Sequence, residues 1–70
     1  MNFIHNKLKG RIIEILGSNQ AFIQKMKISN ASFYGKINGE KEFTDEEIYK
    51  ACKILQINPT DVYEYFFKTE

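Results

Sequence analysis

The stretch from residue 18 to 39 constrains the fold most, because it holds two short amphipathic helical patterns on either side of one tight turn. Phe22 and Met26 lie four residues apart and so share one face of the first helix. Phe33 and Ile37 have the same spacing in the second. Helices this short are unstable alone, so each must pack against the other and a surrounding core. The pattern fits a helix-turn-helix unit, whose second helix presents its polar face to DNA, and equally a plain pair of packed helices.

Residues that cap helices mark the boundaries of the other elements. Ser18 and Ser29 can each cap one of the two short helices, and Asn58 can start a last one. Thr44 and Glu47 have the spacing of a capping box. The carboxylates that follow Thr44 suit this helix start better than a metal site, because consecutive side chains point around a helix. The sequence therefore predicts helices at about residues 7–16, 19–26, 30–38, 45–55 and 59–67.

The first and fourth helices are predicted from apolar residues at helical spacing. Asn6 is expected to cap the first helix, and Gly17 is expected to end it with a positive φ. Gly10 lies inside this helix. It either allows close approach of a neighbouring helix or a nucleic-acid backbone, or is a tolerated exposed glycine. The expected buried stripes are Leu8, Ile12, Ile15 and Leu16 in the first helix, and Ile48, Ala51, Cys52 and Leu55 in the fourth.

Chain length and cysteine content limit the class of protein. Seventy residues form one domain, residues 1–70, with little room for a deep active-site cleft. Cys52 is the only cysteine, so we expect a reducing, cytoplasmic setting and interpret this thiol as a small core residue before a reactive one. No apolar run is long enough for a membrane span. His5 has no nucleophile beside it and no phosphate-binding loop is present, so we expect neither an enzyme nor a cofactor or metal site.

The charges are segregated along the chain, although the net charge is only +1. Residues 1–41 carry seven basic and two acidic groups, a net of +5, and residues 42–70 carry three basic and seven acidic groups, a net of −4. The basic part contains the two short helices, where phosphate contact would be needed. The acidic part would be repelled by a duplex, so we expect it to face solvent or a protein partner.

The last helix has more aromatic residues than a small core readily buries. Val62, Phe66 and either Tyr63 or Tyr65 can face inward, which leaves one or two rings over. An exposed aromatic surplus indicates a surface for self-association or for a partner. Packing of these rings in the core, together with Phe3, is the competing interpretation.

These elements, in this order, resemble the helix-turn-helix proteins of the phage repressor and Cro type. The resemblance runs from about Leu8 to Phe67. It is carried by Lys9-Gly10-Arg11-Ile12-Ile13, Gln20-Ala21-Phe22, Ile28-Ser29, Lys36-Ile37-Asn38-Gly39, Glu42-Phe43-Thr44 and Tyr65-Phe66-Phe67. The chain is most similar to the small Cro-position proteins of Gram-positive temperate phages, especially the modulator-of-repression type of a lactococcal phage. The resemblance implies an all-α fold, a compact five-helix lambda-repressor-like helix-turn-helix domain, in a bacterial host.

The resemblance also implies a site on the third helix. By position, Asn30 and Ala31 would face base edges with Tyr34 behind them, since an amide suits adenine and a methyl group suits thymine. Polar groups at the start of the second helix and the end of the third would hold phosphates, and two lysines would add charge. The candidate residues for binding DNA or a partner are Asn19, Gln20, Ser29, Asn30, Ala31, Ser32, Tyr34, Lys36, Asn38 and Lys41.

Two positions differ from the pattern of these proteins. The turn has Lys27 where glycine is usual, and a lysine with positive φ is strained unless the turn adjusts. Ile23 stands where alanine is usual, at the crossing of the two short helices. The third helix also lacks Arg and Lys among its first residues, which predicts weak, strongly salt-dependent binding to DNA.

Two functions follow from the resemblance. The first is a Cro-like transcription regulator of the lytic/lysogenic switch, which acts with the phage repressor at operator DNA and dimerises on paired half-sites. The second is an antirepressor that acts chiefly in a hetero-complex with the repressor and has little or no sequence-specific DNA binding. An antitoxin partner role is a minor third interpretation, because fold alone does not determine function.

Overall fold

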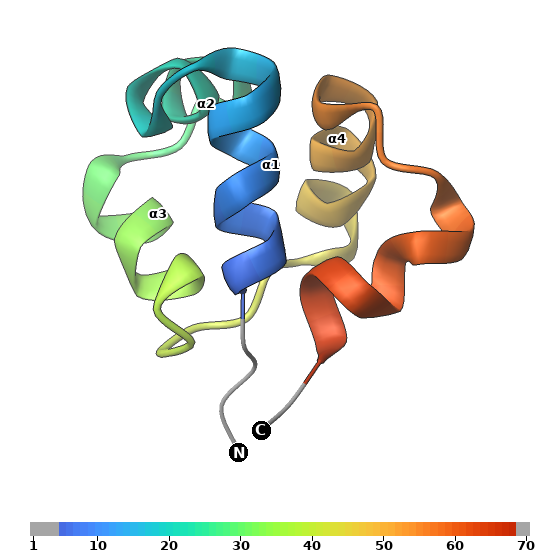
Figure 1. Cartoon of the computed structure of the whole chain (residues 1–70). Coiled ribbons are helices and arrows are strands. Elements are labelled where there is room, and N and C mark those ends of the chain that lie inside the picture. The colour runs from blue at the N-terminus through green and yellow to red at the C-terminus, as the bar shows by residue number, and fades with distance from the viewer. Residues whose placement is uncertain (1–4, 69–70) are drawn as a thin grey trace.

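The computed structural model describes residues 5–68, and all regular structure in this part of the chain is helical (Figure 1). The predicted all-α fold is therefore confirmed. The helices are α1 (Asn6–Leu16), α2 (Asn19–Met26), α3 (Asn30–Ile37) and α4 (Asp45–Leu55). They are followed by a short 3₁₀ turn, Pro59–Asp61, and a π-helical turn, Tyr63–Phe67. We call residues 59–67 the C-terminal segment.

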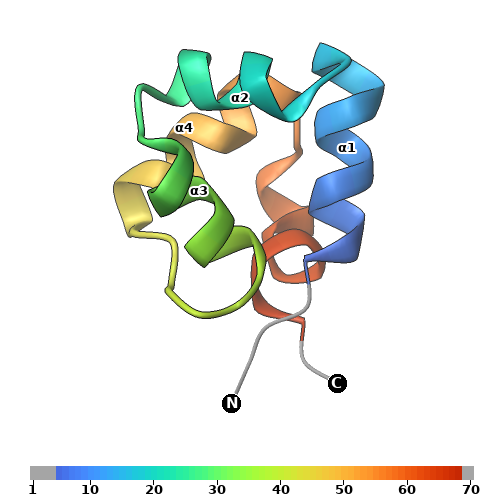
Figure 2. The same ribbon diagram turned by 90° about the vertical axis from the view of Figure 1, so that its left-hand side faces the viewer.

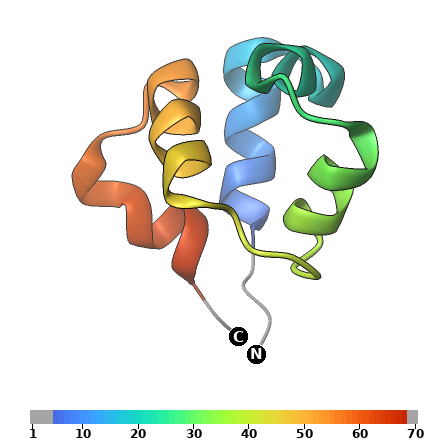
Figure 3. The ribbon, with the colours of Figure 1, turned by 180° about the vertical axis from the view of Figure 1, so that it is seen from behind.

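The long helix α1 lies between two groups of elements. Figure 1 shows α3 on one side of α1, and α4 with the C-terminal segment on the other; Figure 3 shows the same arrangement from behind. In the view of Figure 2, α2 lies above α3 and the turn that joins them is on the left. Helix α1 packs on α2, α4 and the C-terminal segment. Helix α3 and the C-terminal segment thus lie on different sides of α1 (Figure 1 and Figure 3).

The core is formed where the apolar faces of these elements meet. The rings of Phe22 and Phe33 meet edge to face with their centroids 5.8 Å apart, which joins α2 to α3. Burying a side chain of this size contributes roughly 1.5–3 kcal/mol to folding. Ile15, Leu16 and Cys52 only partly enter this core. Its buried members are Leu8, Ile12, Phe22, Ile23, Met26, Phe33, Ile37, Ile48, Ala51, Leu55, Ile57 and Phe66.

The predicted caps hold three of the helices in place. The hydroxyl of Ser18 accepts a hydrogen bond from the amide of Ala21, and that of Ser29 accepts one from Ser32. Thr44 and Glu47 form the full capping box at the start of α4. Gly17 ends α1 with φ 83°, as predicted.

The predicted cap of α1 is wrong. Asn6 is the first residue of the helix, and His5 precedes it without a side-chain cap. The helix begins one residue early because His5 is itself buried, and its carbonyl accepts the hydrogen bond from the amide of Lys9. His5 also approaches Tyr65 O with Nδ1, at 3.2 Å. Packing against the C-terminal segment therefore determines where α1 starts.

The last predicted helix, 59–67, is irregular. The side chain of Asn58 accepts from the amide of Thr60, and the 3₁₀ turn then widens into the π-helical turn. Phe66 is buried and Tyr65 half-buried, whereas Tyr63 is 61% exposed. Aromatic rings of the C-terminal segment are therefore exposed at the surface, as the first interpretation expects. The competing interpretation also involved Phe3, which lies outside the described residues. No helix within residues 5–68 combines the length and apolar character that crossing a membrane requires.

Candidate functional site

The turn between α2 and α3 is built on a lysine in a left-handed conformation. Lys27 has φ 60° and ψ 45°, and its amide donates to the carbonyl oxygen of Ile23 at 3.0 Å. The turn therefore keeps the geometry that usually favours glycine, at a cost of about 1–2 kcal/mol. Ile23 is buried at 5% exposure, so the core accommodates its branched side chain.

Helix α3 is anchored by its apolar face and open on its polar face. Phe33 and Ile37 are buried at 1% and 4% exposure. The ring of Phe33 also meets the ring of Tyr34 edge to face, at 5.0 Å between centroids. Tyr34 is 42% exposed, so its ring is supported on one side and accessible on the other. The exposed predicted residues of this helix and its caps are Ser29, Asn30, Ala31, Tyr34 and Asn38. We call these five the α3 face.

Of the remaining polar candidates, one is half-buried on α3 and two lie at the far end of α2. Ser32 is half-buried on α3. Asn19, half-buried, and Gln20, exposed, open α2 at the end away from the turn. An eight-residue helix is about 12 Å long, so these two lie roughly that distance from the start of the turn.

Lys36 does not contribute the free charge that was expected. Lys36 is only 9% exposed, and its ammonium is bound to the carboxylate of Glu47 in α4. That carboxylate also accepts from the amide of Thr44 at 2.9 Å. Burial acts to raise the pKa of Glu47, but the hydrogen bonds from Lys36 and Thr44 outweigh it and hold this pKa below its ordinary value. Lys36 is thus a structural residue that ties α3 to α4.

Lys41 lies against the end of α3. Its amide and that of Glu40 both donate to the carbonyl oxygen of Gly35, at 3.0 and 2.9 Å. A Cβ atom at Gly35 would lie 3.3 Å from Cδ of Lys41, so glycine leaves room for the lysine stem. In the described segment 29–41, Lys41 is the only lysine outside an ion pair. Its charge is available to a ligand.

Two further lysines adjoin the turn and were not among the predicted site residues. Lys25 in the last turn of α2 and Lys27 in the turn are both exposed. They place positive charge just before Ser29. The excess of basic groups in residues 1–41 indicated them, but the amphipathic pattern gave no reason to prefer them over other lysines.

Comparison with known proteins identifies the family. A family model described as a protein of unknown function (DUF739) matches residues 1–69. The chain belongs to this family. No match was found among curated proteins.

A solved structure extends this result for the DUF739 chain. The chain is similar to the solution structure of the modulator of repression (MOR) of the temperate bacteriophage TP901-1 from Lactococcus lactis. The two sequences are 33% identical, and the two structures superpose with a TM-score of 0.81. The match covers 100% of this chain and 97% of the other. The resemblance to phage proteins of the modulator-of-repression type is therefore confirmed, and it holds for the whole chain.

Proposed function

We propose that this chain acts in the lytic/lysogenic switch of a temperate phage by binding the phage repressor through the α3 face. The proposal is supported by the similarity to a modulator of repression over the full chain. It is also supported by the exposure of Asn30, Tyr34 and Asn38 on a helix whose other side is fixed in the core. In this proposal the protein is an antirepressor with a Cro-like fold, and its hetero-complex with the repressor changes what the repressor occupies on operator DNA.

The ion pair of Lys36 with Glu47 is the observation that favours a protein partner over DNA. It removes the one lysine of α3 from the surface, and lysine and arginine supply most of the electrostatic affinity for the phosphate backbone. The α3 face that remains carries hydroxyl, amide, methyl and tyrosine groups. Tyrosine is a frequent anchor of protein interfaces, and uncharged polar groups surround such anchors well.

Direct binding to operator DNA is the second candidate function. It is supported by Asn30 and Ala31, whose exposed side chains have the chemistry to contact adenine and thymine in a major groove. Lys25, Lys27 and Lys41 would supply the phosphate contacts. Three such contacts give weak binding, because affinity and its dependence on salt both grow with the number of neutralised phosphates, so a homodimer on paired half-sites would be needed for useful affinity.

A gel-shift series on phage operator DNA separates the two functions. The chain alone, the repressor alone and the mixture are compared at low and physiological salt, and the mixture is also run on a sizing column. We expect a joint peak on the column, an altered repressor shift in the mixture, and little shift by the chain alone. A strong sequence-dependent shift by the chain alone, lost on Asn30→Ala, without a joint peak, would establish the second function and exclude the first.

A further inference from the structure

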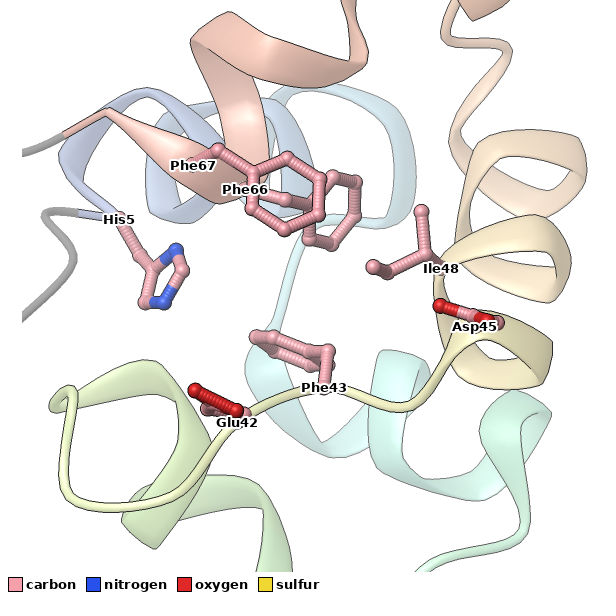
Figure 4. A pocket seen from close by; sticks show the side chains of 7 residues that line it. All are labelled: His5, Glu42, Phe43, Asp45, Ile48, Phe66 and Phe67. Atoms are coloured by element: carbon pink, nitrogen blue, oxygen red, sulfur yellow. The ribbon is translucent and has the colours of Figure 1, made fainter.

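A groove runs along α4, bordered by the C-terminal segment and by the connection from α3 to α4. It consists of two hollows of about 180 and 310 Å³ that share Asp45, Ile48 and Phe67 in their walls. Figure 4 shows the smaller one, with Phe43, Phe66 and Ile48 around it and Phe67 beside Phe66. The larger is lined by Tyr49, Cys52, Pro59 and Val62 in addition to the shared residues. Because both hollows border the same three residues, they form one continuous surface, which we call the α4 groove.

The α4 groove suits side chains better than a small molecule. Pockets for metabolites and drugs commonly enclose about 300–1,000 Å³, and the larger hollow only reaches the lower end of that range. Tyr49 and Phe67 are 64% and 39% exposed at its edge, so aromatic rings stand at an open surface. Such a surface, exposed and apolar but shallow, is typical of a site for a macromolecular partner.

The charges around the groove define that partner. Glu42 and Asp45 lie at the wall of the smaller hollow (Figure 4), and neither forms an ion pair within residues 5–68. By contrast Glu47 and Glu64 are each paired with a lysine. Lys53 places its ammonium 4.6 Å from the ring centroid of Tyr49. Glu42 and Asp45 can therefore pair with Lys or Arg side chains of a partner.

We propose that the α4 groove binds an amphipathic helix of a partner protein, one whose apolar side chains enter the two hollows and whose Lys or Arg side chains pair with Glu42 and Asp45. Apolar anchors at i, i+3, i+4 and i+7 are the usual way in which a helix occupies such a groove. None of the five residues of the α3 face lines either hollow, so the proposal is independent of the function proposed for the α3 face.

A second copy of this chain is a poorer occupant. A two-fold contact through the groove would bring Glu42 and Asp45 of both copies, four carboxylates, into one interface, and an excess of like charge at an interface costs affinity. A head-to-tail contact between the acidic groove and the basic N-terminal part would be heterologous, and it would build rings or open filaments and not a simple dimer. A different protein with a basic amphipathic helix avoids both difficulties.

The test is a titration of the ¹⁵N-labelled chain, followed by NMR, with a synthetic amphipathic helix of about four turns. One peptide carries leucines at i, i+3, i+4 and i+7 with lysines between them, and a second peptide has glutamates in place of the lysines. We expect saturable shifts from the lysine peptide in the amides of residues 42–52 and 59–67. Asp45→Asn should weaken this binding roughly three- to tenfold, and Tyr49→Ser by a similar factor.

Glu14→Gln is the charge control, because the exposed carboxylate of Glu14 lies on α1, where it pairs with Arg11 and lines neither hollow, and it should leave the affinity unchanged. Circular dichroism of each variant checks that it is folded. Equal binding of the two peptides, shifts centred on α3, or no saturable shift up to about 1 mM peptide would each overturn the proposal.

Discussion

The ammonium of Lys36 in α3 is bound to the carboxylate of Glu47 in the first turn of α4. The same carboxylate completes the capping box with Thr44. The side chain of Glu47 therefore both caps the start of α4 and ties this helix to α3. Both side chains are largely buried, at 11% and 18% exposure. This contact determines how α3 sits on the core, and it also leaves the α3 face with little charge of its own.

Glu47→Ala should lower the free energy of unfolding by about 2–4 kcal/mol. The substitution leaves the buried ammonium of Lys36 without its partner and removes half of the capping box. Urea denaturation monitored by circular dichroism measures the change. Glu46→Ala is the matched control, since Glu46 is an exposed carboxylate of the same turn and should cost less than about 1 kcal/mol. Equal losses from the two variants would show that the ion pair does not stabilise the fold.

The stability of the fold should fall as the pH is lowered from about 7.5 through the ordinary histidine pKa of 6.5, because of His5. Burial lowers the pKa of His5 below its ordinary value of 6.5, and Lys9 adds to this, although the hydrogen bond to Tyr65 opposes it. The unfolded chain therefore takes up a proton near pH 6.5 that the folded chain takes up only at lower pH. The free energy of unfolding then decreases as the pH falls, by at most about 1.4 kcal/mol per pH unit.

Urea denaturation at several pH values in this window measures the effect. His5→Phe keeps a ring at the site, which faces Phe43 edge to face at 5.3 Å, and should make the curve flatter. The pKa of Glu47 is also lowered, but its titration lies at a more acidic pH, since its ordinary value is 4.5. An identical pH dependence in the His5→Phe variant would contradict the assignment to His5.

Lys27→Gly should raise the free energy of unfolding by up to about 1 kcal/mol. Glycine removes the strain of the left-handed conformation, worth about 1–2 kcal/mol, and loses about half of that gain because it is more flexible when unfolded. Gln56→Gly, at φ 56° after α4, should behave alike. Lys25→Gly lies within α2 and should instead lower stability by about 1 kcal/mol. Thermal unfolding distinguishes the expected gain in stability of the first two variants from the expected loss in Lys25→Gly. A loss of stability in Lys27→Gly would contradict the left-handed conformation of this turn.

Gly10→Ala should stabilise the fold more than Gly35→Ala. A Cβ atom at Gly10 meets nothing within 4 Å, so alanine gives its full helix propensity of about 1 kcal/mol. At Gly35 the new methyl group would press on Lys41 at 3.3 Å, and the lysine must shift. Denaturation midpoints of the two variants measure the difference. A larger gain at Gly35 would show that Lys41 does not pack on α3.

The sequence allowed the local parts of this structure to be predicted. Ser18, Ser29 and Thr44 act on amides only three residues away, so their role can be inferred from spacing alone. Phe33 and Ile37 were predicted as anchors because helical periodicity identifies a buried face without knowledge of what covers it.

Features that depend on distant partners were not predictable in this way. Lys36 looked like a surface cation, because Glu47 is eleven residues further on and belongs to another helix. The start of α1 was misplaced because His5 packs near Tyr65, sixty residues away. Nor does periodicity distinguish a regular last helix from the 3₁₀ and π-helical turns of residues 59–67, whose geometry depends on burying Phe66.

The central claim is that the α3 face binds the phage repressor, and calorimetric titration of purified repressor with the chain tests it most directly. Tyr34→Ala should weaken binding at least tenfold, as expected for an aromatic anchor. Tyr63→Ala removes another exposed tyrosine, on the C-terminal segment, and should leave the affinity unchanged. If Tyr34→Ala binds as tightly as the unaltered chain while Tyr63→Ala does not, the repressor contacts a different surface and the claim is contradicted.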